Sequence, residues 1–237
     1  MKSGYIAIGL LLLCCVLYYA YSSRITATGL SDIVDLSNGP ITIEGSNVML
    51  PTSSTPAFTH SLFIYFKDGE SGETMNIIYR GDATPYEESI YLTGGTEPKV
   101  TYKIGYTLDG ADSVNQTTSL VIPIQKWVHI TYVISENTIE TYKDGTLMYS
   151  EYFTNSNLNS SGSALDGNDI EIGVSNPTIS GYIAKYKYFN KALNIDEITA
   201  THNDLLSEIG SSKTHNDYGL LLSLRQGNSE LSNLFSI

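Results

Sequence analysis

The 237-residue chain contains few cysteines, few basic residues and a single tryptophan. Its two cysteines, Cys14 and Cys15, are adjacent and lie in the most apolar stretch of the sequence. The remainder of the chain therefore has neither a disulfide framework nor a cysteine-ligated zinc site. Residues 25–237 must fold by burying apolar side chains alone, which a domain of this size can do.

Basic residues are also too few for nucleic-acid binding. The chain has 13 Lys and Arg against 25 Asp and Glu, which gives a formal net charge of −12, and no basic run offsets this balance. We therefore expect no nucleic-acid partner. What is abundant instead is tyrosine (18 residues) and glycine (20 residues), a composition typical of β-rich proteins.

The longest uncharged run lies near the N-terminus, over residues 3–23. Its apolar part, Tyr5–Tyr21, would rise about 1.5 Å per residue as a helix and span about 25 Å, enough for a thin hydrocarbon core. Tyrosines at both ends, flanked by Lys2 and Arg24, suit the two headgroup levels. The pattern predicts a single-pass membrane anchor over residues 1–24.

A cleaved signal peptide is the alternative, because Ala20-Tyr21-Ser22 matches a small-x-small cleavage site. The apolar run is longer than a usual signal-peptide core, which favours an anchor that stays attached. The next segment, residues 25–39, is expected to be a stalk.

Short alternating runs separated by turn residues fill most of the remaining sequence. Clear examples are Ser61–Phe66, Val100–Tyr106 and Trp127–Val133. Between residues 138 and 149, Asp144-Gly145 supplies the positive φ that a tight hairpin turn requires. We predict an all-β fold, an antiparallel two-sheet jelly-roll sandwich, over residues 40–205.

Residues 194–210 have the signature of one short C-terminal helix. Asn194 and Glu197 form a capping-box pattern, and apolar residues recur near helical spacing before Gly210. The segment 206–237 is Leu-rich and is expected to add a strand to the sandwich or to dock on a partner.

The runs Gln125–Val133 and Asn137–Gly145 resemble the laminin-G-like modules of the concanavalin A-like lectin/glucanase superfamily. The order of motifs continues through Ile170–Gly173, Gly181–Ile183 and Asn190–Leu193. The resemblance covers about residues 40–205 and implies a jelly-roll sandwich. Function does not follow from it, since this fold hosts lectins, hydrolases, adhesion modules and structural proteins.

Five residues of these motifs are expected to serve the fold. Trp127 is predicted to be a buried anchor, with stacking on a sugar as the alternative. Asp144 and Gly145 are turn residues, and Gly173 and Gly181 are expected to relieve crowding or permit a bulge.

The resemblance also implies a calcium site, because many laminin-G-like modules hold one Ca²⁺ at the rim of the sandwich. The oxygen donors available for it are Asp109, Asp112, Asp166, Asn168 and Asp169, for which ordinary turn formation is the alternative role. No other cofactor is expected.

No catalytic residues are predicted. The glucanase branch of the superfamily uses a Glu-x-Asp-x-x-Glu pattern, because retaining hydrolysis needs two carboxyl groups about 5 Å apart. The nearest pair here, Asp169 and Glu171, lacks the third carboxylate. We therefore expect a protein that is not an enzyme.

An anchor followed by a laminin-G-like domain resembles membrane-bound virion proteins of large DNA viruses. That resemblance implies a minor capsid or virion membrane protein that links a membrane to a protein shell, with capsid or other virion proteins as partners. A membrane-anchored, glycan-binding lectin or adhesion module is the alternative. Two sequons, at Asn115 and Asn159, are available for glycosylation if the domain is luminal.

Overall fold

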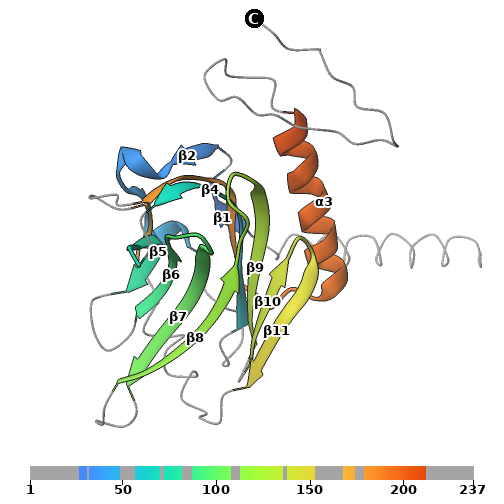
Figure 1. Ribbon diagram of the computed structural model, residues 1–237. Helices are drawn as coiled ribbons and strands as arrows, with labels where there is room; N and C mark the ends of the chain where they lie inside the picture. The colour runs from blue at the N-terminus through green and yellow to red at the C-terminus, as the bar shows by residue number, and fades with distance from the viewer. Residues whose placement is uncertain are drawn as a thin grey trace, which may run out of the picture.

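The computed structural model describes residues 27–30, 32–48, 57–69, 72–81, 87–107, 113–135, 138–152, 168–173 and 179–211. These residues form two antiparallel sheets packed face to face, with helix α3 (Ile195–Ser211) along the outer side of one sheet (Figure 1). The predicted all-β sandwich with one C-terminal helix is thus confirmed.

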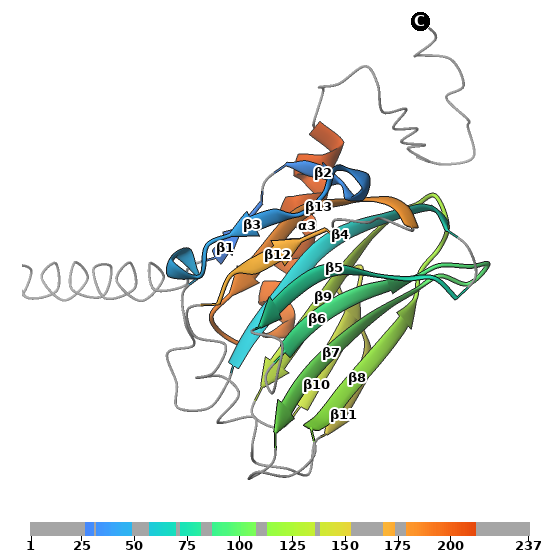
Figure 2. The same cartoon turned by 90° about the vertical axis from the view of Figure 1, so that its left-hand side faces the viewer.

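The sheet beside the helix, sheet A, has seven strands, and the other, sheet B, has six. Sheet A has the order β1 (Ala27–Gly29), β13 (Ile179–Phe189), β4 (Ala57–Gly69), β9 (Trp127–Ser135), β10 (Thr138–Lys143) and β11 (Thr146–Tyr152), with β2 (Ile33–Asp35) also paired to β13. Sheet B, onto which Figure 2 looks, has the order β3 (Ile41–Ile43), β12 (Ile170–Ile172), β5 (Thr74–Gly81), β6 (Glu87–Thr93), β7 (Lys99–Thr107) and β8 (Ser113–Val121). Two short 3₁₀ turns, η1 (Leu36–Asn38) and η2 (Gly45–Asn47), flank β3.

The main core lies between the sheets and follows the two-residue period of the strands. In β9, Val128, Ile130, Tyr132 and Ile134 face this core and are fully buried. The alternate residues of β9 face the opposite side, where α3 packs, and His129 and Val133 are buried there. The central strands β4 and β9 are therefore buried on both faces, which explains their nearly continuous apolar sequences.

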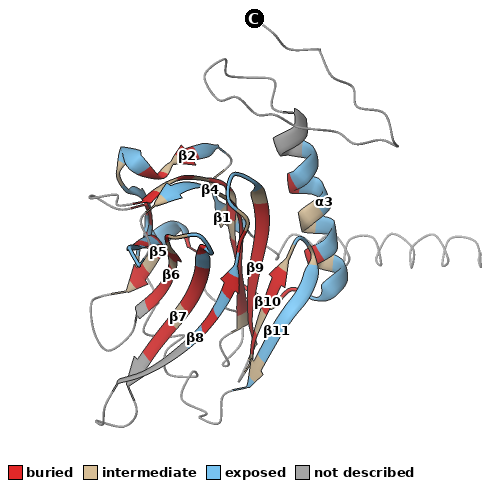
Figure 3. Cartoon of the chain, viewed as in Figure 1, coloured by how far each residue is buried: buried red, intermediate tan, exposed pale blue. Residues whose placement is uncertain are grey.

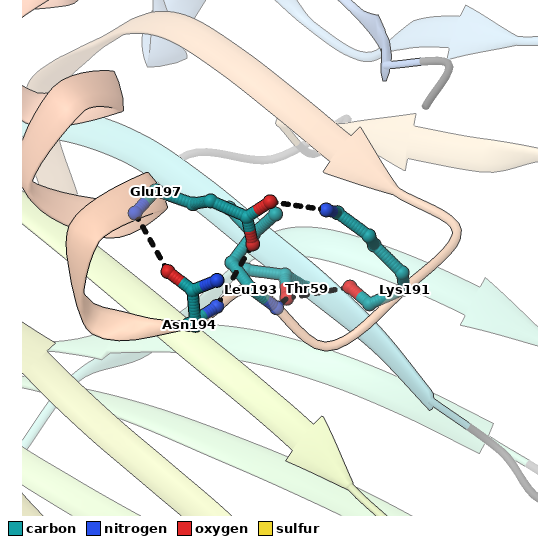
Figure 4. Close-up of polar contacts among 5 residues, drawn as sticks. All are labelled: Thr59, Lys191, Leu193, Asn194 and Glu197. Atoms are coloured by element: carbon teal, nitrogen blue, oxygen red, sulfur yellow. Dashed lines mark hydrogen bonds and ion pairs between the residues drawn. The ribbon is translucent and has the colours of Figure 1, made fainter. Parts of the chain in front are cut away.

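Helix α3 is fixed at its start by the predicted capping box (Figure 4). The Glu197 N–H donates to Asn194 Oδ1, and the Asn194 N–H donates to Glu197 Oε2, both at 3.0 Å. Glu197 also pairs with Lys191. The buried Thr59 hydroxyl of β4 donates to the Lys191 carbonyl at 2.8 Å and accepts from the Leu193 N–H at 3.0 Å, so the helix start is tied to sheet A.

The glycines and the turn singled out in the sequence have the expected structural roles. Asp144 and Gly145 have φ values of 48° and 78°, as a tight hairpin turn requires. A Cβ on Gly181 would lie 2.5 Å from the Tyr65 carbonyl oxygen, beside a bulge in the pairing of β13 with β4. Gly173 has a φ of 83°, which other residues rarely adopt.

Two sequence-based expectations are wrong. The expected stalk, residues 25–39, is part of the sandwich where it is described, because β1 and β2 both pair with β13. Trp127 is half-buried and packs outside the sheets, against Phe63, Ala184 and Leu205. Its position in β9 places it on the outer face, which the end of α3 covers only in part.

The predicted anchor, residues 1–24, lies outside the described residues, as does most of the segment 206–237. Within the described ranges, no helix combines the length and the apolar character needed to cross a membrane.

Candidate functional site

The long connections of the sandwich leave from one end, which we call the loop rim. There β5, β7, β9 and β11 end and β4, β6, β8, β10 and β12 begin. In sheet A, Ala57 and Thr138 both pair with Ser135, and Tyr152 pairs with Thr138. In sheet B, Gly81 pairs with Glu87, which pairs with Gly105.

A hydrogen bond shows that these two strand ends lie at the same end of the molecule. His60 Nε2, near the start of β4, lies 2.7 Å from Glu88 Oε1, near the start of β6. The connection between β11 and β12, residues 153–169, and that between β3 and β4, residues 44–56, are the longest at this end. At the opposite end, the β10–β11 turn has only Asp144 and Gly145.

All five predicted calcium donors belong to connections of the loop rim, and the structure describes two of them, Asn168 and Asp169. Asp109, Asp112 and Asp166 lie outside the described residues. Asp169 Oδ1 accepts a hydrogen bond from the Gly45 N–H at 2.7 Å and so fastens η2 to the start of β12. Among the residues whose positions are given, no three His, Cys, Asp or Glu side chains are grouped to hold a metal ion.

Strand order separates the strand ends beside these donors. In sheet B, β12 is three strands from β7, which corresponds to about 14 Å at about 4.8 Å per strand. The start of β12, with Asn168 and Asp169, is therefore about 14 Å across the sheet from the end of β7, after which Asp109 and Asp112 follow in the sequence. Calcium binding stays a prediction.

Directly beneath the loop rim, a network of polar side chains is buried between the sheets. Glu88 Oε1 accepts a 2.6 Å hydrogen bond from the Tyr102 hydroxyl, in addition to its contact with His60. His60 Nδ1 lies 3.0 Å from the Tyr186 hydroxyl. The Arg80 guanidinium lies 5.2 Å from the centroid of the Tyr188 ring. The six residues of this network are 0–2% exposed.

The electrostatics of this network are balanced. Burial opposes ionisation of Glu88, but His60, Arg80 and the Tyr102 hydrogen bond outweigh it and hold the pKa of Glu88 below its usual range. Burial, with the Glu88 charge, raises the pKa values of Tyr102 and Tyr186 well above their ordinary value. Both tyrosine hydroxyl groups therefore stay protonated. The charged groups of the network are then the Glu88 carboxylate and the Arg80 guanidinium, whose charges are opposite.

The network fixes the base of the β5–β6 connection, residues 82–86. Arg80 and Glu88 are direct cross-strand partners, one pair before Gly81 and Glu87, which end the ladder at this connection. Their opposite charges attract across the two strands and favour this register of the strand ends. The base of this connection is therefore buried and its charges are compensated.

A second polar cluster lies on the outer face of sheet A, beneath α3. His129 Nε2 lies 2.8 Å from the Ser61 hydroxyl oxygen, and His129 Nδ1 lies 3.2 Å from His202 Nδ1 of the helix. The Phe63 ring stacks on His129 at a centroid distance of 4.7 Å. Burial and the neighbouring His202 lower the pKa of His129 to about 3, so its ring is neutral at pH 7.

Both clusters contain side-chain types used for proton transfer, but their burial excludes a substrate. His60, Glu88, Ser61 and His129 are each 0% exposed. A general base must come within hydrogen-bond reach of the group that it deprotonates, and here the protein itself fills that position. The geometry indicates structural roles for both clusters.

The sequence pattern did not reveal either cluster, although it contains one signal of the first. Arg80 and Glu88 occupy positions of β5 and β6 whose same-face neighbours, Ile78 and Ile90, are core residues. A charged residue at a strand position that the alternation assigns to the apolar face indicates either the end of the strand or a buried pair of charges. Only the pairing of the strands distinguishes these two cases.

Of the two sequons, Asn159 lies outside the described residues. Asn115 belongs to β8, where its backbone is paired opposite Gly105. Glycosylation at either site stays a prediction.

Comparisons with known proteins agree with this architecture. A family model described as the concanavalin A-like lectin/glucanases superfamily matches residues 36–199, which is more than half of the chain. The chain therefore belongs to this superfamily, as its sequence motifs predicted. No curated protein matches the chain in sequence.

Solved structures with the same fold include binding domains of botulinum neurotoxins. The serotype G binding domain is similar at 15% identity with a TM-score of 0.51, over 76% of this chain and 46% of that one. The binding domain of neurotoxin DC in complex with rat synaptotagmin II gives 13% identity, a TM-score of 0.54, and 76% and 47% coverage. A third structure is of botulinum neurotoxin type C, whose cell entry is dependent upon interaction with two ganglioside molecules. It is 15% identical with a TM-score of 0.52, over 76% of this chain and 46% of that one. The chain thus spans less than half of each of these structures, and the likeness shows the fold alone.

Proposed function

We propose that this member of the concanavalin A-like superfamily is a non-enzymatic binding module, held at a membrane by residues 1–24, that engages a glycan through its loop rim. The observation that carries the proposal is the convergence of the long connections at one end of the sandwich. Binding residues are commonly placed on loops that a rigid scaffold positions.

The composition of these connections suits hydroxyl-rich ligands. Residues 153–169 contain four Asn and two Asp among 17 residues, together with several Ser and Gly. Such side chains donate to and accept from sugar hydroxyl groups, and their carboxylates can also ligate calcium. The neurotoxin domains support this class of function, since one binds synaptotagmin II and another depends upon gangliosides.

The absence of enzymatic activity is part of the proposal. The buried pairs His60–Glu88 and Ser61–His129 are closed to substrates. The exposed Glu171 and Asp169 are the nearest match to a glucanase pair, and Asp169 is engaged with the Gly45 backbone.

Binding of the full chain to a glycan array, with calcium and with a chelator, tests the proposal. We expect selective binding that falls at least tenfold in the double variant Asp109→Asn/Asp112→Asn if calcium takes part. The matched control is Asp204→Asn, an exposed residue of α3 two positions after His202, which lies against the β10–β11 turn at the opposite end, and this variant should bind as the unaltered chain does. An array without any selective binding would refute the glycan proposal.

A second candidate function is a link between a membrane and a protein shell, as a minor capsid or virion membrane protein. The observation that favours it is the uncharged run over residues 3–23 joined to this domain. The chain should then require detergent for extraction and should co-purify with assembled particles. Glycan binding together with absence from particles would exclude this candidate.

A further inference from the structure

Strand β11 presents an apolar edge that no other described segment covers. Its residues Leu147, Met148, Tyr149 and Tyr152 are 46%, 43%, 46% and 69% exposed. It pairs with β10 on one side and is the last strand of sheet A within the described part of the chain. Figure 3 shows β11 largely exposed at the end of sheet A, in contrast to the largely buried β9 two strands away.

The exposure arises because sheet A extends one strand beyond sheet B. The last strand of sheet B, β8, faces β10, as the 3.2 Å contact between the Thr118 and Thr141 hydroxyl groups shows. Tyr149 lies opposite Thr141 in the β10–β11 ladder and shares its inward face. Thr141 is fully buried, whereas no strand of sheet B among the described residues lies beneath Tyr149.

The edge also has little of the protection that edge strands usually carry. Glu151 is the only charged residue of β11, and its seven positions contain no proline. An uncovered strand of this composition pairs readily with another segment.

We propose that the C-terminal segment, residues 212–237, covers β11 by pairing with its free edge. The course of α3 brings the chain that precedes this segment past the start of β11. A Cβ on Gly145 would lie 3.8 Å from the His202 side chain, so the start of β11 lies against α3. Ser211, where α3 ends, is nine residues beyond His202, about 14 Å along the helix.

The segment has the length and composition that the edge requires. Its 26 residues could extend to about 86 Å, several times the length of β11. It contains two apolar runs, residues 218–224 and 231–237, and the first has seven residues, as β11 does. Two basic residues, Lys213 and Arg225, balance two acidic ones, Asp217 and Glu230, so this segment is neutral in a chain of net charge −12.

This pairing gives the C-terminal segment a structural role in the fold. It buries the exposed apolar side chains of β11 and blocks the edge against a second copy of the chain. The inference is independent of the proposed function, because β11 and the loop rim are tested by different variants and different measurements.

Limited trypsin digestion of the full chain tests the pairing, with release of the peptide 226–237 followed by mass spectrometry. Tyr149→Asp places a charge on the covered edge and should speed cleavage after Arg225 at least tenfold. The matched control is Thr117→Asp on β8, an exposed position of the other sheet's edge, which should leave the rate unchanged. Equal rates in all three proteins would overturn the proposal.

Hydrogen exchange of the β11 amides provides a second measurement, in which the substituted residues all lie in the C-terminal segment and the strands keep their sequence. The triple variant Leu220→Ser/Leu222→Ser/Leu224→Ser should speed exchange in β11 at least tenfold and leave β8 unchanged. Exchange that is equally fast in both proteins contradicts the pairing. Protection of β11 that instead rises with protein concentration would assign the edge to a second copy and would also overturn the proposal.

Discussion

The two faces of β4 bury polar side chains in different ways. His60 points between the sheets and contacts the carboxylate of Glu88, with Arg80 as the countercharge. Its neighbour Ser61 points to the outer face and contacts the neutral His129 beneath α3. One face therefore holds two opposite charges, on Glu88 and Arg80, and the other holds the neutral His129 beside a hydroxyl group.

The difference follows from what each face offers. Between the sheets, strands β5 and β6 bring an acid and a base into direct cross-strand pairing, so each charge is met by its opposite. Beneath α3, His129 meets another histidine, a hydroxyl and the Phe63 ring, none of which is an anion. Burial therefore opposes the charged form of both groups, but only for Glu88 do neighbouring charges and hydrogen bonds outweigh it.

The largest expected effect comes from removing one of the two opposite charges buried between the sheets. Glu88→Gln leaves Arg80 buried without its countercharge and should cost about 3–5 kcal/mol of unfolding free energy, measured by urea denaturation. Arg80→Met/Glu88→Gln removes both charges and should cost less than the sum of the single variants. The exposed Glu171→Gln serves as the control. A loss below about 0.5 kcal/mol for Glu88→Gln would show that the pair is unimportant.

The outer cluster should make stability depend on pH. The folded-state pKa of His129, about 3, lies below the value of 6.5 expected when unfolded, so the unfolded state binds more protons between these limits. The unfolding free energy that the neutral His129 contributes is therefore fully present above pH 6.5 and is lost as the pH falls toward 3. Between pH 7 and pH 5 this loss should be about 2 kcal/mol. In His129→Gln this part of the pH dependence should disappear, and identical pH profiles would contradict the assignment.

The two faces should also differ in the cost of removing an aromatic side chain. Phe58 is 1% exposed in the main core, and Phe58→Ala should cost about 3–5 kcal/mol. Trp127 is half-buried on the outer face, and Trp127→Ala should cost only about 1–2 kcal/mol, because less of its apolar area is removed from water. Equal denaturation midpoints for the two variants would mean that the outer face is packed as tightly as the core.

The smallest expected effect concerns the start of α3. Asn194→Ala removes the side-chain oxygen that accepts from the Glu197 N–H and should cost about 1 kcal/mol. Asn203→Ala, at an exposed position within the helix, is the control and should cost nothing, because alanine has the higher helix propensity. If both variants have the same stability, the cap does not stabilise the helix.

Local sequence signals were sufficient to predict those features in which neighbouring residues alone determine the backbone conformation. The Asp144-Gly145 turn and the capping box of Asn194 and Glu197 depend on φ angles and on hydrogen bonds within four residues. Both were predicted and both are present. The ordered motifs also identified the superfamily, because they encode turns and strand alternation that this fold requires.

Signals failed where a residue's partner lies far away in the sequence. The segment 27–35 has no periodicity of its own, and only β13, some 150 residues later, makes strands of it. Trp127 is a sheet residue as predicted, but whether its face is the core or the helix side depends on how two sheets and α3 stack.

The sequence by itself thus determined the class of fold, the hairpin turn and the helix start, since each depends on short-range geometry and on the two-residue alternation of strands. Only the tertiary structure decided that Arg80 and Glu88 form a buried pair, that Ser61 and His129 meet beneath α3, and that β11 overhangs sheet B. These features depend on strand order and on sheet packing. A pattern of alternating residues indicates that a strand has a buried face, but it does not specify which strand or helix covers that face.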